Sequence, residues 1–88
     1  MKIRNEIIID FPLNFYIEED IKNLEETYTK AQLIKNKNSE EYQKLEEEFY
    51  EYTLDLEISV NGAWRSGCFS EEQGNLILWK YEPFNWGD

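Results

Sequence analysis

The chain has 88 residues, with 19 Asp and Glu against nine Lys and Arg and no histidine, so its formal net charge is −10. A negative field of this size repels nucleic acids and anionic membranes and accelerates encounter with basic proteins. Without histidine there is no Ser-His or Cys-His catalytic pair, and the single Cys68 excludes an internal disulfide. We therefore expect one domain, residues 1–88, that is not an enzyme, binds no nucleic acid or membrane, and recognises a basic protein surface.

Hydrophobic residues make up 41% of the chain and aromatic residues 16%, a composition typical of a folded domain rather than a disordered one. No apolar run approaches the roughly 20 residues that a membrane-spanning helix needs. The N-terminus has neither the long apolar stretch nor the cleavage site of a signal peptide. These features predict a soluble, cytoplasmic protein, and the richness in Lys, Asn, Ile and Glu suits a bacterial or phage-infected host cell.

The first predicted element is a strand from Glu6 to Phe11. Ile7, Ile9 and Phe11 alternate with the residues between them, which is the pattern of a strand with one buried face. Pro12 removes a backbone donor, so the strand should end there.

Between residues 17 and 52 the apolar period changes to that of a helix. Ser39 is a plausible N-terminal cap with two glutamates behind it, which favours two antiparallel helices joined by a short polar turn. Two apolar stripes with steps of three and four support this interpretation: Ile21, Leu24, Tyr28 and Ala31, then Tyr42, Leu45, Phe49 and Tyr52.

One continuous helix is the alternative for the same segment. Both stripes share a heptad frame, and neither glycine nor proline occurs between Leu13 and Asn61. Lys35 and Asn38 would then occupy the middle of the seam, where polar residues fix register in coiled coils. Such a helix would have to bury its stripe against a second chain.

From Tyr52 to Val60 apolar and polar residues alternate, and Asn61-Gly62 follows, the pair best suited to a tight hairpin turn. Further strands are predicted from about Ala63 to Phe69 and over 76–81. The fold class is therefore α+β: a small single domain of order β-α-α-β-β-β, with a three- to four-stranded antiparallel sheet and a helical hairpin, or one long helix, packed on one face. The predicted core comprises Leu24, Tyr28, Leu45, Phe49, Leu54, Leu56, Ile58 and Leu78.

No metal or cofactor site is indicated, because the chain has no Cys/His spacing, no calcium-loop pattern and no Gly-rich phosphate loop. The acidic helical surface is the main binding candidate. Residues 18–57 hold 13 acids and 5 bases, a net of −8. Like charges four residues apart on a helix repel each other, and a basic partner would neutralise that repulsion. The predicted partner-binding residues are Glu40, Glu41, Glu47, Glu48, Glu51, Trp64 and Trp86.

Trp64 has two alternative environments, depending on the hairpin turn. A two-residue turn at Asn61-Gly62 places it on the polar face beside carboxylates, and a longer loop buries it. An exposed tryptophan would serve as an apolar anchor of an interface. Trp86 is the second candidate for that role.

The profile is similar to that of small phage-borne inhibitors and toxin-immunity proteins, which are short, acidic and free of catalytic groups. That similarity implies an inhibitor that occupies the basic nucleic-acid- or nucleotide-binding site of a target protein, its glutamates standing in for phosphates. One alternative is a structural protein that self-associates through its helical segment, as a homodimer. Another is a small-molecule-binding domain with a pocket lined by Trp79, Tyr81 and Phe84.

Overall fold

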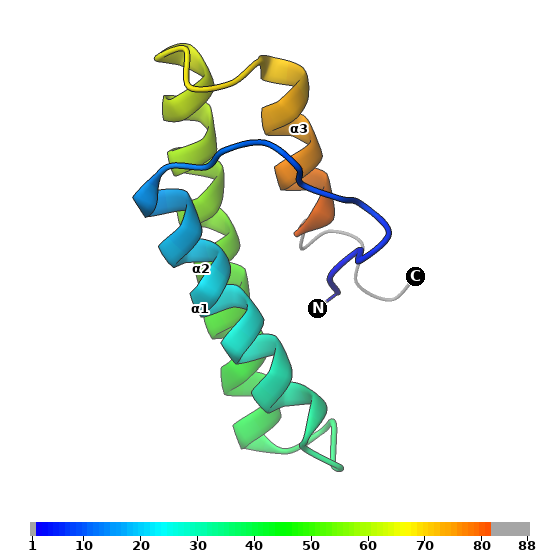
Figure 1. The fold of residues 1–88 in the computed structure, drawn as a ribbon. Helices are drawn as coiled ribbons and strands as arrows, with labels where there is room; N and C mark the ends of the chain where they lie inside the picture. Colours follow the sequence, from blue (N-terminus) through cyan, green and yellow to red (C-terminus); the bar gives the residue numbers. More distant parts are fainter. Residues whose placement is uncertain (1, 82–88) are drawn as a thin grey trace.

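The computed structural model describes residues 2–81 and contains three helices, α1 (Phe15–Gln32), α2 (Glu40–Arg65) and α3 (Glu71–Lys80). Helices α1 and α2 form a long antiparallel hairpin, and α3 lies beside the C-terminal half of α2 (Figure 1). The Cα envelope measures 43 × 22 × 18 Å, since the closed end of the hairpin projects beyond α3. The described residues contain no strand, so the predicted α+β class and the order β-α-α-β-β-β are wrong.

The segment between residues 17 and 52 folds as two helices, not as one. The side chain of Asn14 caps α1 by accepting from the backbone N–H of Ile17 at 2.9 Å. Ser39 caps α2 by accepting from the N–H of Tyr42 at 3.2 Å, which confirms its predicted role. Because the chain reverses before Ser39, the apolar stripes of α1 and α2 bury each other, and no second chain is needed to cover them.

The predicted strand from Tyr52 to Val60 is the second half of α2. Its alternation coincides with a helical stripe, because Leu56 and Val60 are four residues apart and extend the series that begins at Phe49. A helix already propagating from Ser39 adds one hydrogen bond per residue, whereas a strand needs a partner strand. The buried residues of α2 are Phe49, Thr53, Leu56, Val60 and Ala63, with steps of four, three, four and three.

Asn61-Gly62 is not a turn, since α2 continues through it to Arg65. The chain reverses instead at Gly67, whose φ of +87° is a conformation that favours glycine. The segment predicted as the last strand belongs to α3. This helix begins with a capping box, in which Ser70 Oγ accepts from Gln73 N at 3.1 Å and Gln73 Oε1 accepts from Ser70 N at 2.8 Å. The strands predicted over 63–69 and 76–81 are therefore wrong as well.

A glycine allows α3 to approach α2 closely. A Cβ atom at Gly74 would lie 3.1 Å from Val60 Cγ1 and 3.3 Å from Trp64 Cδ1. Phe69, in the loop before α3, would lie 3.4 Å from the same Cβ. The contact between the two helices therefore depends on the absence of a side chain at this position.

The N-terminal segment, residues 2–14, runs across the helices without pairing as a strand (Figure 1). Arg4 N donates to Lys80 O at 2.9 Å, which ties the segment to the end of α3. Ile9 and Phe11 pack against the core while Ile8 is 70% exposed, and the Phe11 ring meets Phe69 edge-on at 5.6 Å. The predicted strand is therefore wrong: residues 5–7 form a turn, and only the alternation from Ile8 to Phe11 belongs to an extended, unpaired segment.

Only part of the predicted core is buried. Leu24, Phe49 and Leu56 are at most 1% exposed, which confirms them, whereas Tyr28, Leu45 and Leu78 are half-buried. Leu54 is 39% exposed and Ile58 is 72% exposed, so their assignment to the core is wrong. Successive side chains of a helix are about 100° apart, so residues two positions from Leu56 point away from the core.

Candidate functional site

The five predicted glutamates all lie on the first half of α2, but they do not share one face. Glu40, Glu47 and Glu51 are exposed on the side of α2 opposite the core. Glu41 and Glu48 lie on the flank that borders the end of α1. The two groups border each other on α2, and they differ in the charges that surround them.

The flank bearing Glu41 and Glu48 is locally compensated. It forms a shallow groove at the closed end of the hairpin, in which three lysines lie with the two glutamates. Such a mixture of charges gives a hydrated surface with little net field. The residues that line the groove are Lys30, Leu33, Ile34, Lys35, Glu41, Lys44, Leu45 and Glu48.

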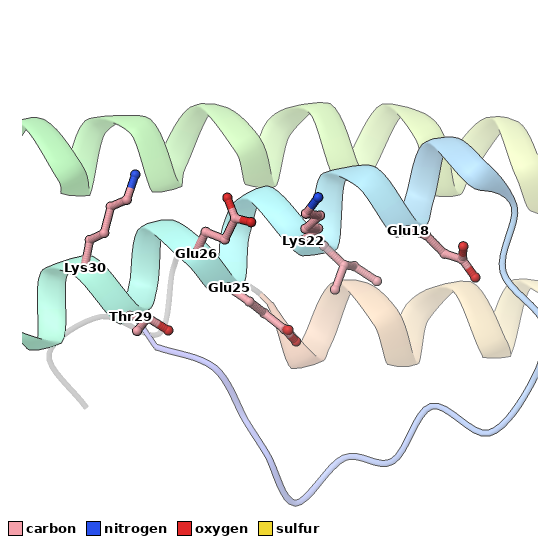
Figure 2. A pocket seen from close by; sticks show the side chains of 7 residues that line it. Glu18, Lys22, Glu25, Glu26, Thr29 and Lys30 are labelled. Carbon is pink, nitrogen blue, oxygen red and sulfur yellow. The ribbon is translucent and has the colours of Figure 1, made fainter.

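The exposed side of α1 mixes three glutamates with two lysines (Figure 2). Six labelled polar side chains lie along one shallow depression, and Glu25 points away from Lys22 and Lys30. Glu26 precedes Lys30 by four residues, the favourable order for an opposite-charge pair on a helix. This side of α1 is therefore explained as a solvated face that stabilises its own helix.

The side of α2 opposite the core differs from both. It carries Glu40, Glu47 and Glu51, and Lys44 lies one turn from both Glu40 and Glu47. Glu47 and Glu51 are like charges one turn apart. Two exposed apolar residues, Leu54 and Ile58, follow them on the same side. We call this surface the outer face of α2; it consists of Glu40, Glu47, Glu51, Leu54, Ile58, Asn61 and Arg65.

Sequence reasoning missed Leu54 and Ile58 as surface residues because it placed them on a sheet. The signal was present, since Glu47, Glu51, Leu54 and Ile58 follow one another in steps of four, three and four. That spacing puts all four on one side of a helix. An apolar centre beside a charged rim is the usual anatomy of a protein interface.

Trp64 is half-buried at the contact between α2 and α3, where it borders the outer face without being part of it. Its Nε1 donates to Asn61 Oδ1 at 3.2 Å, and Arg65 Cζ lies 5.5 Å from its ring centroid. The hairpin turn on which both predicted environments of Trp64 depended does not form, because α2 continues through Asn61-Gly62. Trp86 lies outside the described residues.

The proposed aromatic pocket is not formed by its two described members. Trp79 is 54% exposed, and Arg4 Cζ lies 5.6 Å from its ring centroid. Tyr81 is only 3% exposed, and its hydroxyl donates to Glu25 Oε1 at 3.0 Å. Phe84 lies outside the described residues.

Asp20 and Tyr81 have raised pKa values, and each makes a hydrogen bond between α1 and another part of the fold. Partial burial raises the pKa of Asp20 on α1, and the neighbouring Asp55 and Glu19 charges add smaller increases. The hydrogen bond that Ser59 Oγ donates to Asp20 at 2.9 Å opposes this shift. Burial and the carboxylate of Glu25 raise the pKa of Tyr81 well above its usual value. Both groups join α1 to another part of the fold and lie within the structure, so we assign them to stability.

Residues 2–81 contain no cluster of three Cys, Asp or Glu side chains placed to hold a metal ion. None of their helices combines the length and the apolar character that crossing a bilayer requires. Comparisons of the chain with protein-family models, with curated proteins and with solved structures found no match.

Proposed function

We propose that this protein is a small acidic inhibitor that binds a basic surface of a target protein through the outer face of α2. The kind of target is a nucleic-acid- or nucleotide-binding protein, whose basic site is built for phosphates. A cytoplasmic location in a bacterial or phage-infected cell is part of the same proposal.

The observation that carries the proposal is the position of two apolar side chains beside three carboxylates on the same side of α2, which outnumber the single lysine near them, Lys44. Ile58 is 72% exposed and Leu54 is 39% exposed, next to Glu47 and Glu51 on the same side of α2. Burying the apolar pair would supply affinity, and the carboxylates would steer a basic partner and set its orientation. Of the three surfaces described above, this one combines both properties.

The experiment compares two double charge reversals that alter the net charge equally. Glu47→Lys with Glu51→Lys changes the outer face, and Glu41→Lys with Glu48→Lys changes the flank beside α1. A target is first isolated by pull-down from the native host at low salt, and its affinity for each protein is then titrated at two salt concentrations.

We expect the outer-face variant to lose at least about 2 kcal/mol of binding free energy, roughly thirtyfold in Kd, because attraction becomes like-charge repulsion. The flank variant should lose far less. Salt should weaken the wild-type complex mainly through a slower association rate. Equal losses in both variants would show that only the overall charge matters and would refute the assignment to the outer face.

A further inference from the structure

The outer face of α2 has the spacing of a coiled-coil seam. From Glu47 to Arg65 its residues follow in steps of four, three, four, three and four, and the seam lies opposite the residues that α2 buries. Neither α1 nor α3 covers it, because both pack on the other side of α2. A helix of 26 residues therefore presents a second, unoccupied packing seam.

This seam is complementary to itself when a second copy runs antiparallel. In a twofold arrangement centred on Leu56, residues equally distant from Leu56 along the chain face each other. Leu54 then meets Ile58 of the second copy, since both lie two residues from the centre. Glu47 meets Arg65 of the second copy, since both lie nine residues from the centre. Between these layers Glu51 faces Asn61, so no layer of the seam sets like charges opposite each other.

We infer that a second copy of this chain covers the outer face of α2, as an antiparallel homodimer with its twofold axis at Leu56. Symmetry doubles each contact, which gives two Leu54–Ile58 layers and two Glu47–Arg65 pairs. The opposing effect is the net charge of −10 on each chain, which repels the copies and makes the dimer a weak one.

The dimer would also regulate the site, a consequence that rests on the proposed function. The same side chains that would contact a basic partner are covered in the dimer, so the two associations exclude each other. Glu41 and Glu48 stay uncovered, because they lie on the flank beside α1. The protein would then bind its target as a monomer, and the dimer would compete with the target only at high concentrations of the chain.

The test is sedimentation equilibrium of the full chain from about 1 µM to 1 mM with a set of charge swaps. Wild type should show a concentration-dependent dimer. Glu47→Arg sets arginine opposite Arg65, and Arg65→Glu sets glutamate opposite Glu47, so each variant alone should dimerise at least tenfold more weakly. An equimolar mixture of the two should recover association as a heterodimer, and the double variant should recover the homodimer. Glu48→Arg, with the same change in charge on the flank, should not weaken the dimer.

A wild-type chain that stays monomeric at 1 mM would overturn the inference, as would a mixture of single variants that fails to associate. A Glu48→Arg chain that dimerises as poorly as Glu47→Arg would also overturn it. Far-UV circular dichroism of every variant shows whether the helices are intact. The result is separable from the proposed function, since sedimentation measures the dimer without any partner, and the partner titration can be run at concentrations at which the chain is monomeric.

Discussion

Leu56 and Ile58 are two residues apart, and their truncation distinguishes a helix from a strand at this segment. Leu56 is 1% exposed and Ile58 is 72% exposed. Shortening Leu56 to alanine removes three buried carbon atoms, which is about 2.4 kcal/mol at roughly 0.8 kcal/mol per buried methylene. A cavity contribution comes in addition, so we expect Leu56→Ala to cost about 3–4 kcal/mol, within the range measured for buried leucines.

Ile58→Ala is the matched control, and it should change the free energy of unfolding by about 0.5 kcal/mol or less. The assay is urea denaturation followed by circular dichroism at 222 nm, at low micromolar concentration so that self-association does not contribute. On a strand both side chains would lie on the same face. Comparable losses for the two variants would therefore refute the helical assignment of this segment.

Three further predictions concern the contacts between elements. Gly74→Ala should lower stability by about 1–3 kcal/mol in the same urea assay, because its Cβ would press on Val60 Cγ1 at 3.1 Å; an unchanged midpoint would show that α3 does not pack as described. The raised pKa of Asp20 means that the folded state holds this proton more tightly, so its favourable contribution exists below about pH 4 and is lost as the pH rises through the folded value. Asp20→Asn should then stabilise the protein at pH 7 by a few tenths of a kcal/mol and lose that advantage at pH 3, as thermal unfolding at both pH values can show. The pKa of Tyr81 is raised as well, so its contribution to the free energy of unfolding should be lost as the pH rises above about 10. Tyr81→Phe should lower stability by about 1 kcal/mol at pH 7, because the hydrogen bond to Glu25 is lost, and should make stability less dependent on pH above 10.

The sequence by itself determined the charge distribution and the start of α2 at Ser39. Charge follows directly from composition, and Ser39 marks a helix start because its side chain satisfies a backbone N–H that has no partner within the helix. It also indicated that Ile9 and Phe11 face the core, because alternation of this kind holds for any extended chain with one buried side, but not that Ile3 is buried. These are local properties, and they need no knowledge of distant contacts.

Only the tertiary structure decided the state of residues 52–81. All five apolar residues from Tyr52 to Val60 fit a period of two, and Tyr52, Leu56 and Val60 also continue a helical stripe, so the pattern alone favours a strand without excluding a helix. The choice depends on what covers them: α1 and α3 bury Leu56 and Val60, and no neighbouring strand offers a ladder within residues 2–81. For the same reason the exposed apolar residues of the candidate site are Leu54 and Ile58 and not the predicted Trp64. Exposure is a property of the packed molecule, because it is set by the elements that cover a side chain and not by the side chain itself.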